Sequence, residues 1–390
     1  MRGRSVWRQF DYVSLAIMLL IAGLSIPIIA AGAAPYSPTP YYYVMRQMAW
    51  IGLGVITVFI VAAIPYEKFK KLSPLLYFGS LAMLLYVMIL GRTALGGQRW
   101  IQVGPFQLQP SEFAKIAIII SFATLLDNRG SLTRWRDLIV PLIYVGIPML
   151  LILKQPDLGT TLVFIVIAVG MLYMAGVPGW RLLLIFGGGF GLIVLWVYLH
   201  LTLHVPIPMH RYQLQRLLIF LHPGASPTVA GYNVIQSRIA VGSGGLFGSG
   251  LSLTHSTQLS YLPEAYTDFV YAVVGEELGF VGCVALLFVY LILVARAAYI
   301  AAKARDRYGM LLASGFASMI AFHVLEGAGM ATGLMPVAGV PLPFLSYGGS
   351  AFLTDSAGIG LLVNVYMRRH QALTAGASTS VGAFSKENAS

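Results

Sequence analysis

Apolar runs of about twenty residues recur along the chain, separated by shorter segments that are polar or rich in glycine and proline. At about 1.5 Å per residue, a helix of that length crosses the hydrocarbon core of a bilayer. The pattern predicts ten membrane-spanning helices, at residues 12–31, 46–65, 73–91, 112–126, 137–153, 160–176, 182–204, 268–295, 309–334 and 348–367. Because a lipid-exposed segment must satisfy its own backbone hydrogen bonds, the expected fold class is an all-α integral membrane protein.

One polar stretch is too long to be a simple connection: about sixty residues, 205–267, separate the seventh predicted span from the eighth. Its first part mixes apolar residues with Arg211 and Arg216, and a later part, "GSGGLFGSG", is rich in glycine. Such segments are typical of structure that lies on the membrane interface or dips into it. The polar residues 371–390 predict a flexible cytoplasmic tail after a single polytopic membrane domain, 1–370.

The basic residues predict the orientation of the chain, since cytoplasmic loops carry an excess of Lys and Arg. With the N-terminus inside, seventeen of the 25 Lys and Arg residues fall on the cytoplasmic side, seven fall outside, and Lys115 lies within a span. Both termini are therefore predicted to be cytoplasmic, and the long loop extracytoplasmic. The net charge of +11 reflects mostly this bias, and no separate basic face indicates a nucleic-acid partner.

Composition narrows the classes of function. With 58% hydrophobic and 10% charged residues, the chain leaves no room for a soluble domain. The single cysteine, Cys283, excludes an intrachain disulfide and a cysteine-based metal cluster. No Walker sequence, dinucleotide-binding glycine fingerprint or HExxH motif occurs, so ATP-driven and zinc-hydrolase functions lose support. The stretch "AAGAAP" resembles a cleavage site, but the apolar run before it is long for a signal peptide, and we expect it to be retained.

Polar and acidic features gather in the predicted outer loops, and the first of them is "QPSEFAK". Glu112 and Lys115 are three residues apart at the start of a predicted helix, so they share one face and can pair. Ser111 is a candidate N-cap, and the helix dipole favours an anion at Glu112. Two interpretations stay open for the pair: a structural ion pair that permits a buried lysine, and a role that faces the substrate.

Three further outer segments carry candidate site residues. Asp157 in "KQPDLGTT" precedes a span, where it is either the cap of the helix or a polar lining of an outward-facing cavity. In "GGQRWIQ", Trp100 suits the headgroup layer and Arg99 suits a lipid phosphate. The segment "PLPFLSYGGS", with Ser346 and Ser350, predicts irregular backbone, which at membrane depth is tolerated only when it is buried or lines a watery cavity.

The ninth predicted span holds two ionisable residues, His323 and Glu326, about one turn apart in "HVLEGAGMATG". Ionisable groups inside a membrane are costly, and they commonly pair with one another. We expect a satisfied buried pair at this position rather than catalysis.

The densest acidic stretch is "YLPEAYTDFVYAVVGEELGF", which holds four of the fourteen carboxylates: Glu264, Asp268, Glu276 and Glu277. Thr267 can cap the eighth predicted span, which places Asp268 on its first turn, where unpaired N–H groups favour the ionised form. At about 100° per residue, Glu276 lies about 80° from Asp268, and Glu277 lies nearly opposite. Asp268 and Glu276 are therefore expected to share a cavity, while Glu277 faces elsewhere and is structural.

Five segments together resemble one known family. They are "GGQRWI", "QPSEFAKI", "QPDLGTT", "LPEAYTDFVYAVVGEELGFVG" and "GLMPVAGVPLPFLSYGGS". Their order and loop positions are similar to those of the SEDS proteins (shape, elongation, division, sporulation), and most similar to the RodA branch. The resemblance runs from about Gln9 to Arg369. One departure is Gly327 in the ninth span, where asparagine is expected, and it puts a polar role at that position in doubt.

The resemblance implies a peptidoglycan glycosyltransferase in the bacterial cytoplasmic membrane, with its active face outside. Such an enzyme transfers glycan from an undecaprenyl-diphosphate-linked donor to the 4-hydroxyl of lipid II, and Asp268 is then the catalytic acid or base. The candidate substrate-binding or cavity residues are Glu112, Lys115, Asp157, Glu276, Arg99, Trp100, Arg211, Arg216, Ser346 and Ser350. The implied partners are a class B penicillin-binding protein that crosslinks the strands and other membrane proteins of the elongation complex.

Other functions stay open at this point. Ten spans with buried carboxylates are also consistent with a flippase or transporter of a lipid-linked sugar, and a scaffold that recruits wall enzymes is a third class. The sequence contains no dedicated metal cage, although a divalent cation such as Mg²⁺ would assist the departure of pyrophosphate.

Overall fold

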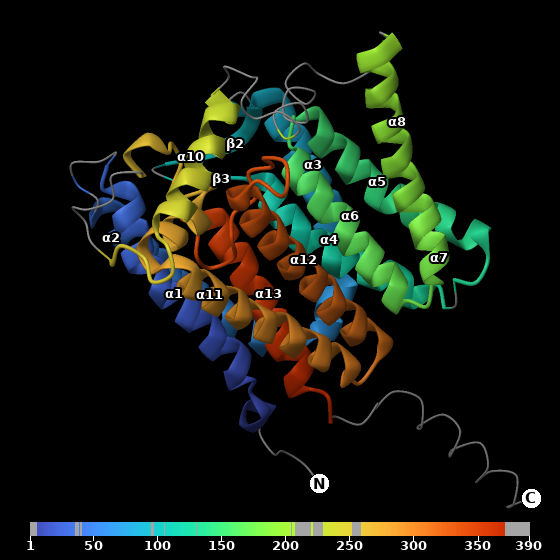
Figure 1. Cartoon of the computed structure of the whole chain (residues 1–390). Helices are drawn as coiled ribbons and strands as arrows, with labels where there is room; N and C mark the ends of the chain where they lie inside the picture. The colour runs from blue at the N-terminus through green and yellow to red at the C-terminus, as the bar shows by residue number, and fades with distance from the viewer. Residues whose placement is uncertain are drawn as a thin grey trace, which may run out of the picture.

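The structure is a computed structural model that describes residues 6–35, 39, 41–94, 97–104, 106–130, 132–203, 205–206, 220, 229–251 and 259–370. It is a bundle of helices (Figure 1). The helices are α1 (Tyr12–Ala33), α2 (Tyr41–Ala63), α3 (Tyr66–Leu90), α4 (Pro110–Asn128), α5 (Ile139–Lys154), α6 (Leu158–Met174), α7 (Gly179–Leu182), α8 (Gly188–Leu203), α10 (Val229–Ser243), α11 (Val270–Ala302), α12 (Arg307–Thr332) and α13 (Gly349–Met367). Short 3-10 turns are η1 (Val6–Gln9), η2 (Trp135–Leu138) and η5 (Leu259–Tyr261), and a π-helical turn, η3 (Leu183–Gly187), joins α7 to α8.

Seven helical stretches in the described part of the chain are long and apolar enough to cross a membrane. They are Tyr12–Ala33, Tyr41–Ala63, Tyr66–Leu90, Trp135–Lys154, Gly179–Leu203, Val270–Ala302 and Arg307–Thr332. Each of them overlaps one of the predicted spans. The prediction of a mostly helical, multi-pass membrane protein is therefore confirmed.

The three other predicted spans also form helices, α4, α6 and α13, but these are shorter or more polar. Thirteen of the nineteen residues of α4 and fourteen of the nineteen residues of α13 are buried. By contrast, α8 has no buried residue and stands at the edge of the bundle (Figure 1). The polar helices α4 and α13 are thus enclosed by apolar ones, which keeps their polar side chains away from lipid.

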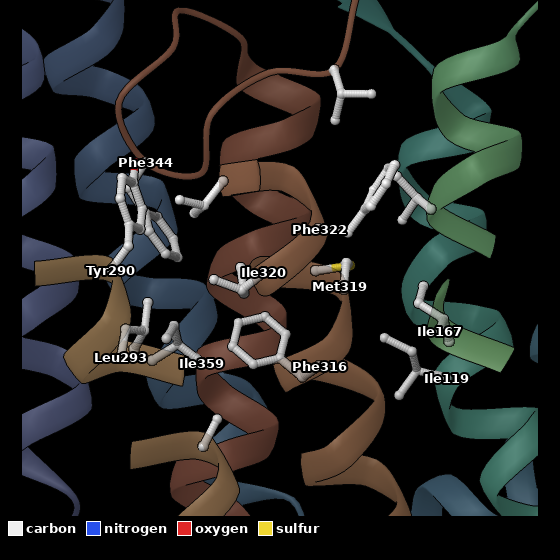
Figure 2. Close-up of a cluster of buried hydrophobic side chains, with 14 of the residues drawn as sticks. Ile119, Ile167, Tyr290, Leu293, Phe316, Met319, Ile320, Phe322, Phe344 and Ile359 are labelled. Carbon is white, nitrogen blue, oxygen red and sulfur yellow. The ribbon is translucent and has the colours of Figure 1, made fainter. Parts of the chain in front are cut away.

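The centre of the bundle is filled by hydrophobic side chains from several helices. Figure 2 shows Phe316 and Met319 of α12 among aliphatic side chains of the neighbouring helices. Both residues are fully buried, as are Ile119 of α4 and Ile359 of α13. At Gly358 of α13, an added Cβ would lie 2.0 Å from the Phe316 ring. Because interiors are close-packed, only glycine lets α13 approach α12 this closely.

A small three-stranded antiparallel sheet lies between α3 and α4, and the all-α prediction did not include it. Its strands are β1 (Arg92–Ala94), β2 (Gly97–Val103) and β3 (Phe106–Leu108), in the order β1-β2-β3. In the register of β2 and β3, Ile101 pairs with Leu108 and Val103 with Phe106, around Gly104 with its φ of 58°. Glycine adopts that left-handed conformation without steric cost, so it suits this tight turn.

The longest helix, α11, is interrupted at Gly279, which has a φ of 67°. The glycine-rich segment that follows α10 packs against the interruption. The Ser249 N–H donates to the Glu276 carbonyl at 2.9 Å, and the Phe280 N–H donates to the Gly245 carbonyl, also at 2.9 Å. These bonds satisfy backbone groups that the break would otherwise leave unpaired in an apolar environment. The described part of the long loop is therefore packed into the bundle at α11.

We predict that Gly248→Ala weakens this packing. Gly248 has a φ of +80°, and an added Cβ would lie 2.1 Å from the carbonyl oxygen of Glu277. Gly250→Ala is the matched control, because Gly250 has a φ of +88° but no atom within 4 Å of the added Cβ. In both variants an alanine must adopt a left-handed backbone conformation, which costs about 1 kcal/mol. Only Gly248→Ala must also displace the segment from α11. The measurement is thermal unfolding in detergent, and equal midpoints for the two variants would contradict the packing described here.

Candidate active site

The acidic stretch before α11 is folded around one carbonyl group. Glu264 has a φ of 58°, and its carbonyl oxygen accepts the N–H groups of Thr267, Asp268 and Phe269 at 3.2, 3.2 and 3.3 Å. A residue other than glycine in this left-handed region carries a cost of about 1–3 kcal/mol, and such strain clusters at functional sites. The turn at Glu264 therefore sets the direction of the Asp268 side chain.

Asp268 precedes the helix, so its predicted place on the first turn of the span is wrong. The helix α11 begins at Val270, and Phe269 is its N-cap. Thr267, which was expected to cap the helix, instead donates its hydroxyl to the carbonyl and carboxylate oxygens of Glu264 at 3.2 and 3.0 Å. The tight turn takes up the N–H groups of these residues and delays the start of the helix. Asp268 is consequently half-buried in a turn rather than held on a helix face.

The Asp268 carboxylate faces the loop between α12 and α13. A Cβ added to Gly339 would lie 3.1 Å from Oδ2 of Asp268. Next to it, the Ala338 N–H donates to Oε1 of Glu326 at 3.2 Å. The Ala338 carbonyl packs against Gly159 of α6, where an added Cβ would lie only 2.6 Å from it. The centre of this loop is thus clamped by α6 and α12 beside Asp268. The segment "PLPFLSYGGS" follows directly, and it is irregular up to Gly348 and mostly buried, as expected.

The two predicted serines of this loop hold backbone groups in place. Ser346 and Ser350 are buried. The Ser346 hydroxyl accepts the Leu342 N–H at 2.9 Å. The Ser350 hydroxyl accepts the Gln109 N–H at 3.2 Å and donates to the Gln107 carbonyl at 3.4 Å. Ser350 therefore connects the start of α13 to the segment between β3 and α4.

Asp157 is the N-cap of α6, so the capping interpretation is confirmed. Its carboxylate accepts the Thr160 N–H at 3.1 Å and the Thr160 hydroxyl at 3.0 Å. It also lies 3.9 Å from the guanidinium of Arg99 and accepts the Gln109 side-chain amide at 3.4 Å. Arg99 donates further to the Gln155 carbonyl at 3.0 Å. Asp157 thus caps the helix and also belongs to a polar network beneath the small sheet.

Trp100 lies on β2, paired with Arg92 of β1, and its side chain is half-buried. The neighbouring Arg99 donates to the Gln155 carbonyl in the turn between α5 and α6, and this bond ties the sheet to the bundle. The predicted contact of Arg99 with a lipid phosphate stays a prediction.

Glu112, Lys115 and His323 form a buried network that joins α4 to α12. Lys115 Nζ lies 2.8 Å from Oε2 of Glu112, and both side chains are at most 3% exposed. The same Nζ lies 3.3 Å from Nε2 of His323. Because an ammonium group only donates, Nε2 must accept, which puts the imidazole proton of neutral His323 on Nδ1. The predicted pairing of Glu112 with Lys115 is confirmed, and the lysine has a second partner that the sequence did not indicate.

Two local predictions around this network need correction. Ser111 is not the N-cap of α4, because Gln109 occupies that position and Pro110 is the first helical residue. Proline suits the first helical position, because an N–H group there would have no partner within the helix. His323 and Glu326 were expected to satisfy each other. Instead His323 contacts Lys115, and Glu326 accepts the Ala338 N–H of the loop between α12 and α13. The partner of His323 lies 208 residues away in the sequence, and that of Glu326 lies 12 residues away.

Sequence reasoning missed Asp355, a buried residue of α13 that interacts electrostatically with Lys115 and Glu112. The available signal was a single carboxylate in the middle of the last apolar run. Among the described residues, no group of three or more His, Cys, Asp or Glu side chains is arranged to hold a metal ion. The described groups around Lys115 form an ionic network.

Glu276 and Glu277 are both buried on α11, directly before the break at Gly279. Their shared-cavity and structural roles stay predictions. Arg211 and Arg216 lie outside the described residues.

An apolar cavity of about 550 Å³ lies between α2, α3, α4 and α13, and its lining includes Ala114 and Thr354, the sequence neighbours of Lys115 and Asp355. It is lined by Thr57, Leu75, Leu76, Gly79, Ser80, Met83, Pro110, Phe113, Ala114, Ile116, Ala117, Ile120, Leu353, Thr354 and Ala357. Pro110, at one end of the lining, follows Gln109 of the polar network directly. A hydrocarbon chain suits such a lining, and a polar headgroup would then lie near the outer loops.

We predict that Lys115→Met destabilises the protein strongly, because it leaves the Glu112 carboxylate buried without its cation. The expected loss is about 3–5 kcal/mol of unfolding free energy. Lys70→Met is the matched control, because the Lys70–Asp127 pair is partly exposed and should contribute about 1 kcal/mol or less.

The double variant Glu112→Gln, Lys115→Met removes both charges and should recover much of the lost stability. Thermal unfolding in detergent measures all three variants. A Lys115→Met protein as stable as the wild type would contradict the assignment of a buried ion pair.

Comparisons with known proteins agree with this architecture. The family model described as "Cell cycle protein" (FTSW_RODA_SPOVE) matches residues 10–371. Peptidoglycan glycosyltransferase MrdB of Escherichia coli (strain K12) is 36% identical over 327 residues, which are 83% of this chain and 85% of the relative.

Two solved structures are similar over nearly the whole chain. One chain comes from a peptidoglycan synthase complex that coordinates polymerization and crosslinking; its TM-score is 0.76 at 31% identity, covering 93% of this chain and 99% of the other. Rod shape determining protein RodA of Thermus thermophilus has a TM-score of 0.67 at 29% identity, covering 93% and 98%. The extent of these matches shows that the chain belongs to the FtsW/RodA/SpoVE family of cell cycle proteins, the SEDS family.

Proposed function

We propose that the chain is a peptidoglycan polymerase, a membrane-embedded glycosyltransferase that builds β-1,4 glycan strands from lipid II. The observation that carries the proposal is the position of Asp268. Its half-buried carboxylate lies in a strained turn against the backbone at Gly339. An apolar cavity that suits a lipid chain lies in the same bundle. The family relatives named peptidoglycan glycosyltransferases support the same activity.

In this proposal Asp268 is the general base. Its carboxylate takes the proton from the 4-hydroxyl of the acceptor sugar as that oxygen attacks the anomeric carbon of the donor. The new C–O bond forms while the bond from the anomeric carbon to the diphosphate oxygen breaks. A single displacement inverts the α-linked donor to a β-linked product, by analogy with one-step inverting glycosidases.

Cations near the outer loops would stabilise the charge on the departing diphosphate. We assign this role to Arg211 and Arg216 of the long loop, because Arg99 is already engaged with Asp157 and Gln155. A divalent cation such as Mg²⁺ would take most of its oxygen ligands from the diphosphate and from water, as Mg²⁺ commonly does at phosphate sites. This fits a chain in which the described residues hold no ready-made cluster of metal ligands.

The proposed topology has ten spans, both termini in the cytoplasm, and the Asp268 turn on the outer face of the bacterial cytoplasmic membrane. The bias of basic residues toward the predicted inner loops supports it. Outside the cell no nucleotide sugars are available, so the donor must be carried by a lipid. The cavity beside α4 is the proposed place for that polyprenyl chain.

We further propose that a class B penicillin-binding protein partners with the chain and crosslinks the strands, together with other membrane proteins of the elongation complex. The support is a similar chain that is part of a peptidoglycan synthase complex. RodA, a rod shape determining protein, is the relative that supports a role in cell elongation and shape.

A lipid II flippase is the second candidate function, and one observation favours it. The buried network of Glu112, Lys115 and His323, with Asp355 close by, lies within membrane helices. Buried ionisable groups of this kind also occur along transport pathways. Polymerisation is favoured because the relatives are named peptidoglycan glycosyltransferases and Asp268 lies in a separate turn before α11.

We predict that Asp268→Asn abolishes most polymerisation without unfolding the protein. The amide keeps the size of the carboxylate but has no basic oxygen, so the rate of glycan synthesis from labelled lipid II should fall by about 10² or more. Asp137→Asn is the matched control, because Asp137 lies in the η2 turn on the predicted cytoplasmic side.

Purified protein with and without a transpeptidase partner is assayed for strand length and rate. A scaffold would be indifferent to Asp268→Asn, and a flippase would form no strands in either protein. Strands of normal length and rate from a folded Asp268→Asn protein would exclude Asp268 as the base.

A further inference from the structure

Three tyrosine rings from distant parts of the sequence meet at the outer end of the bundle. Tyr43 lies in the first turn of α2, Tyr266 in the turn before α11, and Tyr347 in the loop before α13. The ring centroids are 4.9 Å apart for Tyr43 and Tyr266, 5.3 Å for Tyr43 and Tyr347, and 5.9 Å for Tyr266 and Tyr347. The rings are tilted or edge-on to one another, which is the favoured geometry of aromatic pairs. We call these three residues the tyrosine cluster.

The cluster is held rigidly by polar contacts. The Tyr347 N–H donates to the Tyr266 carbonyl at 3.0 Å. The side chains of Tyr43 and Tyr266 are hydrogen-bonded, and the Arg46 side chain hydrogen-bonds Tyr347. The Arg46 guanidinium also lies 4.7 Å from the centre of the Tyr42 ring. Each ring therefore has a defined position, and a cation stands at the edge of the cluster.

The hydroxyls of Tyr266 and Tyr347 stay protonated at physiological pH. Burial, together with the hydrogen bond to Tyr43, raises the pKa of Tyr266 well above its ordinary value. Burial also raises the pKa of Tyr347, although the Arg46 contact opposes that shift. The cluster is therefore an aromatic surface, and all three of its residues remain half-exposed.

Anchoring in the headgroup layer does not account for this arrangement. A tyrosine of an interfacial belt faces lipid, as Tyr41 can, with an exposure of 65%. The cluster instead packs ring against ring and is tied to the turn that carries Asp268. Tyr266 is two residues before Asp268, and Glu264, whose carbonyl shapes that turn, interacts electrostatically with Tyr266.

We propose that the tyrosine cluster is a saccharide-binding platform beside Asp268. The C–H face of a pyranose ring is weakly electropositive and packs on the electronegative face of an aromatic ring. Arg46 and Glu264 flank the cluster and can hydrogen-bond the hydroxyl, acetamido or carboxyl groups of an aminosugar. This inference rests on the proposed function, because the sugar it assigns is an N-acetylated aminosugar of a lipid-linked glycan placed for reaction at Asp268.

The test compares Tyr266→Leu, which removes the ring, with Tyr266→Phe, which keeps the ring and removes the hydroxyl. Tyr86→Leu is the matched control, because Tyr86 is an exposed tyrosine near the end of α3, away from the cluster. Lipid II polymerisation is followed at varied substrate concentration in detergent. Binding of a soluble β-1,4-linked N-acetylglucosamine tetramer is followed separately by saturation-transfer NMR, which needs no turnover. Thermal unfolding checks that each variant is folded.

We expect Tyr266→Leu to raise KM by about tenfold, the upper range for one aromatic contact, with kcat nearly unchanged and tetramer binding lost. Tyr86→Leu should stay close to wild type in both assays. Tyr266→Phe keeps the ring but loses the hydrogen bond to Tyr43, so it should raise KM clearly less than Tyr266→Leu. Running the reaction with lipid II alone and with a preformed lipid-linked glycan identifies which saccharide uses the platform, since KM rises only for that substrate.

An unchanged KM and unchanged tetramer binding in folded Tyr266→Leu would overturn the platform. So would equal losses in Tyr266→Leu and Tyr86→Leu, which would indicate membrane anchoring, or equal losses in Tyr266→Leu and Tyr266→Phe, which would indicate a hydroxyl contact alone. A wild-type protein that binds the tetramer through Tyr266 but makes no strands would contradict the proposed polymerase and leave the platform intact.

Discussion

The fold depends on the need to satisfy backbone polar groups and to give buried charges partners within the protein itself. Lys115 could not be buried in α4 without Glu112 at 2.8 Å and His323 at 3.3 Å. The same requirement explains the break in α11, where the glycine-rich segment after α10 supplies the hydrogen bonds that Gly279 interrupts. Polar helices in the interior and apolar helices at the edge, such as α8, follow from this one constraint.

The irregular backbone before α11 meets the irregular backbone before α13, and the candidate chemistry is found there. The loop before α13 is clamped by Glu326 and by close packing on Gly159, and the turn at Glu264 places Asp268 against that loop. The carboxylate is thus held by two segments that meet only in the folded protein. An apolar cavity between α2, α3, α4 and α13 provides space for a lipid chain in the same bundle. A carboxylate in an irregular turn and an apolar cavity in the same bundle are what a reaction on lipid-linked sugars requires.

Some features that depend on neighbouring residues in the sequence could be predicted, but the caps expected at Ser111 and Thr267 were wrong. Features that depend on distant contacts could not be predicted. The spans follow from the length of apolar runs, and the capping of α6 by Asp157 follows from a short local rule. The predicted position of Asp268 on the first helical turn was wrong, because the Glu264 carbonyl accepts the N–H groups that a helix would have used. The role of Asp355 was missed because its charged neighbours lie on α4, more than two hundred residues away. The small sheet escaped notice because three short strands give a weak signal beside long apolar helices.

The most direct test of the central claim, polymerisation on the outer face, uses the purified chain in proteoliposomes of one known orientation. Labelled lipid II is supplied to one leaflet only, and both strand formation and movement of the label across the bilayer are measured. The account predicts strands when lipid II lies in the leaflet on the side of Asp268, and none when it lies only on the side of the basic loops. Strands formed from the cytoplasmic leaflet alone, or transfer of label across the bilayer without strands, would contradict it.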